Sequence, residues 1–519
     1  MNRNTILGAA IIIVACLVFC SCELAYPFGR DQGNYAYAAW VWLDGGVLYR
    51  DVFVFKPPGT VFVHALAQLM FGHSMTAIRA LDLDWTIVTA LLIAAVARHL
   101  TRRGDLAVIA GVLYPFLYGG MGYWYTCQTD GWLNLFAAAS LLAAGSGADA
   151  FGAGRRQRSL FLLTSAGVLA GVAVVFKYTA VVIAAPLLVI LARERRLVFG
   201  GAVAFVLGSL LPLVTCAGWL WEHGAMDAFL DSQLNLIPTY VAKTGRGTGI
   251  ASLLTFFEMM TSPRRMQLVL GTLIAGLVGL AVHIRRPGDR RELLTVLAWL
   301  LAGAVSCIVQ NKYFSYHYFM MLPGVAILGA LAASDICGRL GRARIPAGLA
   351  IAATLISLSK FPQCWLNLGR LAVGSENLYD SWSDLVDYQE IDTAVRDNLA
   401  LAEYIQKTTR PEDKVFLWGF EPMVNFVAER KTVSRFLYNY PFAVSWGNPA
   451  YESELLAALS ANPPTLFVVS SQDAVPWATG NNADSRQLFE EFTALRAFVV
   501  GRYKPEVQIN RFGVFRLVK

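Results

Sequence analysis

Long apolar segments recur between residues 5 and 360, and they constrain the fold of this chain more than any other feature. Hydrophobic residues make up 56% of the 519 residues, whereas charged residues make up 15%. This composition excludes a soluble globular protein of this length, and segments of roughly 20 apolar residues are long enough to cross a bilayer as helices. We therefore predict a polytopic α-helical membrane protein.

Clusters of basic residues separate these segments and predict the topology. Short cytoplasmic loops are enriched in Lys and Arg, so we place each cluster in the cytoplasm. The first segment is read as a retained helix, because it lacks a convincing cleavage site and further spans follow. The clusters lie at residues 102–103, 155–158, 193–196, 285–291 and 339–344, and the predicted spans, about eleven, at 5–25, 77–100, 104–121, 130–149, 159–176, 179–192, 197–221, 266–285, 292–310, 318–336 and 344–360.

A shorter apolar stretch at residues 59–72 is predicted not to cross the membrane. If it did cross, the basic pair at 102–103 would be exported, against the positive-inside rule. We expect it to form a re-entrant or juxtamembrane helix within a first external loop at about residues 26–76. This loop, the later loops that carry polar motifs and the C-terminal region then share the outer face.

The chain changes character near residue 361. Charges become frequent and apolar runs shorten to strand length, which predicts a small extracytoplasmic α/β domain at residues 361–519 after a transmembrane domain at residues 1–360. The predicted strands lie at 415–418 and 466–469, and helix-like stretches at 399–407 and 485–498.

The first external loop concentrates ionisable residues at the membrane boundary, where such groups usually have a function. It reads Arg-Asp-Gln-Gly-Asn-Tyr-Ala-Tyr at residues 30–37, then Gly-Val-Leu-Tyr-Arg-Asp at 46–51 and Lys-Pro-Pro-Gly at 56–59. Further polar motifs on the predicted outer face are Gln-Thr-Asp at 128–130, Lys177, the aromatic run with His317 and Tyr318 at 313–319, and Asp-Lys-Val-Phe-Leu-Trp-Gly at 413–419 followed by 429–436.

In order and spacing, these motifs resemble the GT-C class of membrane glycosyltransferases, in the family 39/83-like bacterial branch related to protein O-mannosyltransferases and lipid A aminoarabinose transferases. The resemblance implies a polyprenyl-phosphate-linked sugar donor, a glycan, lipid or protein hydroxyl as acceptor, and inversion at the anomeric carbon. It implies a multi-pass protein of the bacterial cytoplasmic (inner) membrane with its active site outside. Membrane lipid is the other expected partner; no cofactor and no nucleic acid are expected, and a divalent metal requirement is left open.

The residue types suit this chemistry. A hydroxyl that attacks an acetal carbon needs a carboxylate to take its proton, and Asp31 is the candidate base. Lys56, on a segment stiffened by two prolines, is the candidate cation for the leaving phosphate, and Arg30 or Arg50 can add bidentate phosphate contacts. Asp130 is the second candidate catalytic residue, with a role in orienting the acceptor, pairing with a cation or sharing the base function. The remaining candidate substrate-binding residues are Asp51, Lys177, His317 and Tyr318.

Structural alternatives stay open for most of these residues. Asp31 can cap a helix that begins near Gly33, and Asp130 can cap the span that it opens. Lys56 can extend its ammonium group to the membrane interface, and Asp51 can pair with its neighbour. Likewise, Lys177 can anchor a span boundary, and His317 can belong to an interfacial aromatic belt. Asp82, within a span, is expected to pair with Arg79 or to line a cavity.

Two departures from the family pattern and two other functional classes complete the interpretation. Phe55 stands where many relatives carry an acidic residue or histidine, and Gln32 replaces a frequent second acidic residue. The eight cysteines predict neither a disulfide framework nor a zinc site. An O-antigen-ligase-like enzyme with a diphosphate lipid donor, or a non-enzymatic transporter or assembly protein of the envelope, remains the alternative.

Overall fold

The computed structural model describes residues 3–192, 197–283, 290–339, 356, 361–375 and 395–518. The chain forms two compact units, and each is described by itself. We call the first the helical unit; it comprises Met1–Ala25, Arg79–Gly218 and Arg246–Ala372. The second, which we call the mixed unit, comprises Tyr26–Ile78, Trp219–Gly245 and Val373–Lys519.

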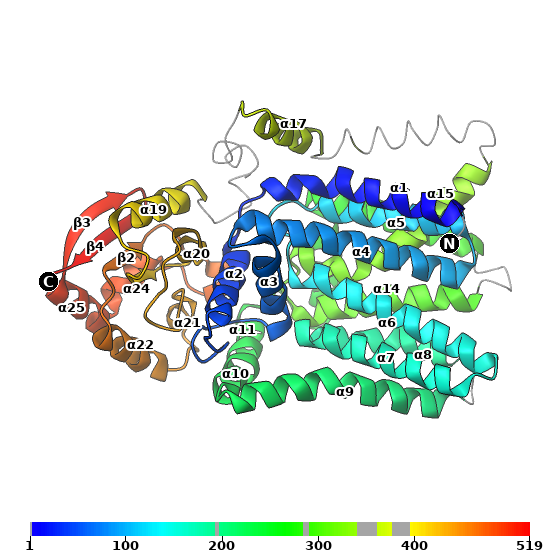
Figure 1. Ribbon diagram of the computed structural model, residues 1–519, viewed down its shortest axis with the longest axis horizontal. Helices are drawn as coiled ribbons and strands as arrows, with labels where there is room; N and C mark the ends of the chain where they lie inside the picture. Colours follow the sequence, from blue (N-terminus) through cyan, green and yellow to red (C-terminus); the bar gives the residue numbers. More distant parts are fainter. Residues whose placement is uncertain are drawn as a thin grey trace. The chain divides into compact units, whose positions relative to one another are not determined.

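The helical unit consists of long apolar helices (Figure 1). Eight helices in the described part of the chain are long and apolar enough to cross a membrane. The unit contains all or most of α1 (Arg3–Cys20), η1 (Ser21–Ala25), α4 (Met75–Thr101), α5 (Gly104–Gly119), α6 (Thr129–Gly152), α7 (Arg156–Phe176), η2 (Tyr178–Ile183), α8 (Ala184–Leu191), α9 (Val198–Glu222), α12 (Ile250–Thr261), α13 (Arg264–His283), α14 (Arg290–Gln310), η4 (Ser315–Met321), α15 (Leu322–Arg339) and α17 (Phe361–Ala372).

The predicted polytopic helical fold is confirmed. Eight predicted spans coincide with these long helices, and two more coincide with the shorter apolar helices Gly104–Gly119 and Tyr178–Leu191. The eleventh, at residues 344–360, lies almost wholly outside the described residues. The stretch predicted not to cross forms α3 (Pro58–Phe71), whose 14 residues also fall short of a typical span.

Small residues allow helices of this unit to pack closely. A Cβ atom on Gly167 of α7 would overlap the carbonyl oxygen of Phe205 in α9, and one on Gly208 of α9 would overlap that of Thr164. Such backbone approach at small residues is typical of membrane helices, because lipid tails provide no hydrophobic driving force between them. α7 and α9 are therefore expected to tolerate little increase in side-chain size at these positions.

The mixed unit combines short helices with a four-stranded sheet of order β1-β2-β4-β3, in which β1 and β2 are parallel and β4 runs antiparallel to β2 and β3. The predicted strands at 415–418 and 466–469 are both present, and the predicted helix at 485–498 is two helices that meet at Phe492. Its elements are α2 (Arg30–Leu43), α3, α10 (Met226–Leu230), the π-helix η3 (Asp231–Leu236), α11 (Ile237–Thr244), α19 (Val395–Thr408), β1 (Val415–Trp418), α20 (Met423–Ala428), α21 (Tyr440–Ala443), α22 (Ala450–Ala461), β2 (Leu466–Ser470), α23 (Pro476–Thr479), α24 (Ser485–Glu491), α25 (Thr493–Arg502), β3 (Tyr503–Ile509) and β4 (Phe512–Leu517).

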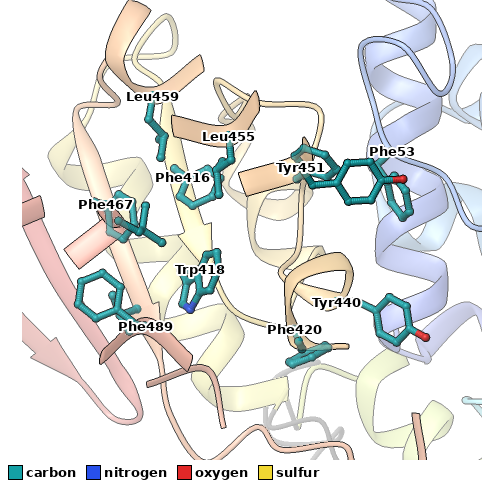
Figure 2. Packing of buried hydrophobic residues seen from close by; sticks show 14 of the residues in the cluster. Phe53, Phe416, Trp418, Phe420, Tyr440, Tyr451, Leu455, Leu459, Phe467 and Phe489 are labelled. Carbon is teal, nitrogen blue, oxygen red and sulfur yellow. The ribbon is translucent and has the colours of Figure 1, made fainter. Parts of the chain in front are cut away.

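One aromatic-rich core joins the first loop to the C-terminal region. Figure 2 shows Phe53, which precedes α3 by five residues, beside Tyr451 of α22 in the same cluster as Phe416, Trp418 and Phe467. The Phe53 ring lies 5.9 Å from that of Phe436 and 6.4 Å from that of Tyr451, centroid to centroid. The first loop is thus folded into the mixed unit, and the division predicted at residue 360 stays a prediction.

Candidate functional site

The first-loop motif forms two parallel helices of the mixed unit, α2 and α3, which lie side by side (Figure 1). Three contacts join the two helices, and in each the partners are about 30 residues apart. Residue numbers rise along both helices from one contact to the next, so the two N-termini lie at the same end. The contacts are the Tyr35 and His64 rings at 5.6 Å, the Gln68 amide that donates to the Ala36 carbonyl at 2.9 Å, and the Trp40 and His73 rings at 5.0 Å. Both positive dipole ends therefore point the same way, which favours an anion near them.

Asp31 lies in the first turn of α2 but does not cap it. The N-cap is Gly29, whose N–H donates to the side-chain oxygen of Gln32 at 3.1 Å. The expectation that Asp31 caps a helix beginning near Gly33 is therefore wrong, because the helix starts at Arg30. Burial raises the pKa of the Tyr438 phenol, and the charge of nearby Asp31 raises it further. Asp31 is half-buried.

Arg30 is paired with a carboxylate of the same unit. Its Nη2 lies 3.0 Å and its Nε 3.3 Å from Oε1 of Glu421, which is fully buried. Arg511 donates to the same oxygen at 2.9 Å, and the amide of Asn398 donates to Oε2 at 2.6 Å. Two guanidinium groups thus share one carboxylate. A phosphate contact by Arg30 stays a prediction.

Lys56 stands immediately before α3, which begins at Pro58, a favoured first helical residue. Its main-chain carbonyl accepts a hydrogen bond from the Tyr49 hydroxyl at 2.7 Å, so the backbone at this point is fixed. Within the described part of the chain, its half-buried ammonium group forms no ion pair. The backbone of Lys56 is thus fixed just before the N-terminus of α3, at the end of the helix pair where α2 also begins.

Arg50 and Asp51 form the local pair that the structural alternative describes. Arg50 donates to both carboxylate oxygens of Asp51, at 2.8 and 2.7 Å, and to the main-chain oxygen of His223 at 3.0 Å. The hydrogen bond from Arg50 is the main cause of a pKa of Asp51 below its ordinary value, and a bond from the Val47 N–H lowers it further. This pair closes the turn between α2 and α3.

Phe55, at the departure from the family pattern, is packed among tyrosines. Its ring lies 5.6 Å from that of Tyr240 and 5.3 Å from that of Tyr440. In the described residues, no group of three or more His, Cys, Asp or Glu side chains is placed to hold a metal ion. The position before Lys56 therefore serves the aromatic core.

A second cluster lies within the helical unit, around Asp130. Asp130, in the first turn of α6, is 1% exposed, and Lys177 donates to its two oxygens at 2.8 and 2.6 Å. The Lys177 ammonium group also lies 5.9 Å from the centroid of the Tyr316 ring. Of the roles predicted for Asp130, pairing with a cation is the one that this geometry contains.

His317 and Tyr318 follow on the 3₁₀ helix η4 and are both buried. The His317 ring lies 4.7 Å from that of Tyr316, which places it beside the Lys177 contact. The hydroxyl of Tyr318 donates to the main-chain oxygen of Phe256 in α12 at 2.8 Å. Tyr318 is thus engaged with α12, and a substrate contact by either residue stays a prediction.

Asp82 and Arg79 of α4 secure the segment that leads into Asp130. Asp82 accepts hydrogen bonds from the Cys127 N–H at 3.1 Å and from the Trp132 indole at 2.5 Å, and Arg79 donates to the Tyr123 carbonyl at 2.9 Å. The sequence predicted that Asp82, a costly charge within a span, pairs with Arg79 or lines a cavity; its contacts with Cys127 and Trp132 were not predicted.

Three further charged residues were not recognised from sequence: Glu421, Arg511 and Lys312. Glu421 and Arg511 stand among ordinary surface charges of the C-terminal region, and no local pattern marks them. Burial, and secondly the charge of Arg246, lower the pKa of Lys312 to about 7. Its position beside the aromatic run at 313–319 was the only available signal.

Comparison with solved structures identifies the fold. The structure of ArnT from Cupriavidus metallidurans in the apo state aligns over 99% of this chain and 97% of that chain, with a TM-score of 0.62 and 14% identity. The chain has a GT-C glycosyltransferase fold. ArnT bound to undecaprenyl phosphate aligns over 99% and 98% with a TM-score of 0.56 and 15% identity. The oligosaccharyltransferase AglB from Archaeoglobus fulgidus, in complex with an inhibitory peptide and a dolichol-phosphate, aligns over 99% of this chain and 74% of that chain, with a TM-score of 0.51 and 12% identity.

At the sequence level, the family described as dolichyl-phosphate-mannose-protein mannosyltransferase matches residues 55–221. This segment begins at Phe55, next to Lys56, and includes Asp130 and Lys177. No curated protein matches the chain. The predicted resemblance to GT-C enzymes related to O-mannosyltransferases and aminoarabinose transferases is confirmed.

Proposed function

We propose that the protein is an integral membrane glycosyltransferase that moves a hexosyl or pentosyl group from a polyprenyl-phosphate donor to a hydroxyl acceptor. The observation that carries the proposal is the common end of α2 and α3, where Asp31 and Lys56 accompany two helix N-termini. The undecaprenyl phosphate bound by ArnT and the dolichol-phosphate bound by AglB support a lipid phosphate as leaving group.

In the proposed reaction, the acceptor oxygen bonds to the anomeric carbon as the bond from that carbon to the phosphate oxygen breaks. Attack opposite to the leaving group inverts the configuration. Asp31 takes the hydroxyl proton, and the Lys56 ammonium group stabilises the charge that develops on the departing polyprenyl phosphate. A role for Asp130 in orienting the acceptor stays a prediction.

The test is release of undecaprenyl phosphate by the purified full-length protein in lipid nanodiscs. Undecaprenyl-phosphate hexoses and pentoses serve as donors, with lipid A, core oligosaccharide and hydroxyl-bearing peptides as acceptors. Asp31→Asn is expected to lower the rate by about 100- to 10,000-fold, because it removes the base and keeps the size of the side chain. Asp227→Asn, which alters an exposed carboxylate of α10, is the matched control.

Lys56→Ala is expected to weaken donor binding as well as turnover, since a charge-assisted hydrogen bond is worth about 1.5–3 kcal/mol. Lys504→Ala removes an exposed lysine of β3 and should change neither. If no donor is consumed in any combination, or if Asp31→Asn retains the wild-type rate, the proposal is wrong in its reaction or in its base.

We also propose that the loops bearing this chemistry lie outside the cytoplasmic membrane of a bacterium. Cysteines placed at the exposed positions Ser375 and Gln157 should report opposite sides: a membrane-impermeant maleimide is expected to label the first and spare the second in intact spheroplasts. Labelling of position 157 alone would invert the proposed orientation.

A further inference from the structure

We propose that Glu421, in the C-terminal part of the mixed unit, is a positioning residue for the first turn of α2, acting through Arg30 on Asp31. This inference rests on the proposed function, because the position of Asp31 matters to the rate only if Asp31 is the base. It gives the C-terminal region a role in the chemistry that is separate from acceptor selection.

Both carboxylate oxygens of Glu421 accept hydrogen bonds from other residues of the mixed unit, in addition to the bond from Arg30. Glu421 follows β1 and precedes α20, and its side chain is fully buried. Asn398 of α19 holds Oε2 at 2.6 Å, and Arg511, in the turn between β3 and β4, holds Oε1 at 2.9 Å. With both oxygens anchored by the α/β fold, the bond from Arg30 to Oε1 sets the place of the α2 N-terminus.

A close backbone contact fixes the same turn a second time. A Cβ atom on Gly33 would lie 2.7 Å from the main-chain nitrogen of Met423, so only glycine permits this approach. Asp31 stands between Arg30 and Gly33, and each of these neighbours touches the segment that holds Glu421. The contacts of these two neighbours therefore help to place Asp31.

Loss of the Glu421 charge is expected to lower stability, because Arg30 and Arg511 are left without this carboxylate, but other contacts hold the first loop in place. The Phe53 N–H donates to the Arg435 carbonyl at 2.7 Å, and the Thr432 N–H donates to the Tyr37 hydroxyl at 2.8 Å. The Phe53 ring is also part of the aromatic core. Removal of the Glu421 charge is therefore expected to displace the first turn of α2 rather than to unfold the unit.

The experiment compares Glu421→Gln with wild type in two measurements on the full-length protein. With an undecaprenyl-phosphate sugar that the wild type consumes, kcat is expected to fall on the order of 100-fold, since a displacement near 1 Å has this effect, whereas donor KM should stay within about threefold. Hydrogen–deuterium exchange in the peptide that contains residues 30–37 should become faster. Glu403→Gln, at an exposed helix pair with Lys407, is the control for both measurements.

A second substitution guards against a folding defect. Glu421→Asp keeps the charge but withdraws it by one methylene group, and its kcat should lie between those of wild type and Glu421→Gln with unchanged thermal stability. Wild-type kcat in either variant, a change confined to KM, or unchanged exchange at residues 30–37 would overturn the inference. If no donor is consumed by wild type, the proposed function fails, and the exchange measurement alone decides the positioning role.

Discussion

Two buried ion clusters in the described part of the chain differ in how many basic partners their carboxylate has. In the helical unit, Asp130 and Lys177 form a pair of one acid and one base, 1% and 10% exposed. In the mixed unit, Glu421 receives both Arg30 and Arg511. A further carboxylate, Asp397, approaches Arg511 only at 3.9 Å and is partly exposed. The first cluster, which we call the neutral pair, has one base for its carboxylate; in the second, which we call the unbalanced cluster, two guanidinium groups share the fully buried carboxylate of Glu421.

This difference separates two uses of buried charge. The partners of the neutral pair are 47 residues apart, and neither can be lost without leaving the other uncompensated. Arg30 and Glu421 are 391 residues apart, so the unbalanced cluster joins distant parts of the chain. Its carboxylate keeps one guanidinium partner if the other is removed. The neutral pair is therefore expected to be the more fragile, and the unbalanced cluster to act mainly on geometry.

Among substitutions that remove a basic residue of these pairs, the largest effect on stability is expected from Lys177→Met. This substitution leaves the Asp130 carboxylate buried without its ammonium partner, and breaking a buried pair in this way costs about 3–5 kcal/mol. The double variant Asp130→Asn with Lys177→Met removes both charges and should recover most of the lost stability. Thermal unfolding in detergent measures both. A Lys177→Met protein as stable as wild type would show that water or lipid reaches Asp130. The Asp130–Lys177 pair would then not be the more fragile cluster.

A smaller loss is expected from Arg511→Met in the unbalanced cluster. Glu421 keeps Arg30 and Asn398, so no charge is left alone, and the cost is that of one hydrogen bond to a charged group, about 1.5–3 kcal/mol. The same unfolding assay applies, with Arg486→Met, at an exposed pair with Glu490, as the control. If Arg511→Met destabilises more than Lys177→Met, Arg30 does not compensate for the loss of Arg511, and the proposed distinction between the clusters is wrong.

The sequence predicted the parts of this fold that depend on local pattern. Apolar length and basic loops located ten helices that the structure describes, and the residue types at 415–418 and 466–469 located two strands. The β3–β4 hairpin was missed. Its strands alternate poorly, since Lys504, Pro505 and Glu506 are all exposed, and Pro505 stands at a bulge. Edge strands of this kind carry little hydrophobic signal.

For the candidate site, the sequence supplied the residue types but not their partners. Asp130 and Lys177 were both selected, yet nothing in the spacing of 47 residues indicates that they meet. Arg30 was selected for phosphate, whereas Glu421, its observed partner, looked like any surface acid. Long-range pairing depends on how α2 packs against α20, which a single sequence does not encode in a readable pattern. The first turn of α2 was placed too late because Gly29, a weak signal, is the N-cap.

The smallest effect on stability is expected from an exposed ion pair. Arg50 and Asp51 are 49% and 36% exposed, so solvent screens their attraction and the pair is worth about 0–1 kcal/mol. The folded-state pKa of Asp51 lies below its ordinary value of 3.8, chiefly because Arg50 donates to it. Its contribution to stability is therefore complete above that ordinary value and is lost as the pH falls through the lower folded-state pKa. Arg50→Gln should destabilise slightly at pH 7 and progressively less as the pH falls below 3.8, as measured by chemical unfolding over this range. The stability of Arg50→Lys, which keeps the charge, should lie between those of wild type and Arg50→Gln.

A stability loss of about 2 kcal/mol or more in Arg50→Gln, or a loss that persists in acid, would contradict this prediction. The bond from Arg50 to the His223 carbonyl would then dominate, and the exposure of a charged pair would not predict its contribution to stability.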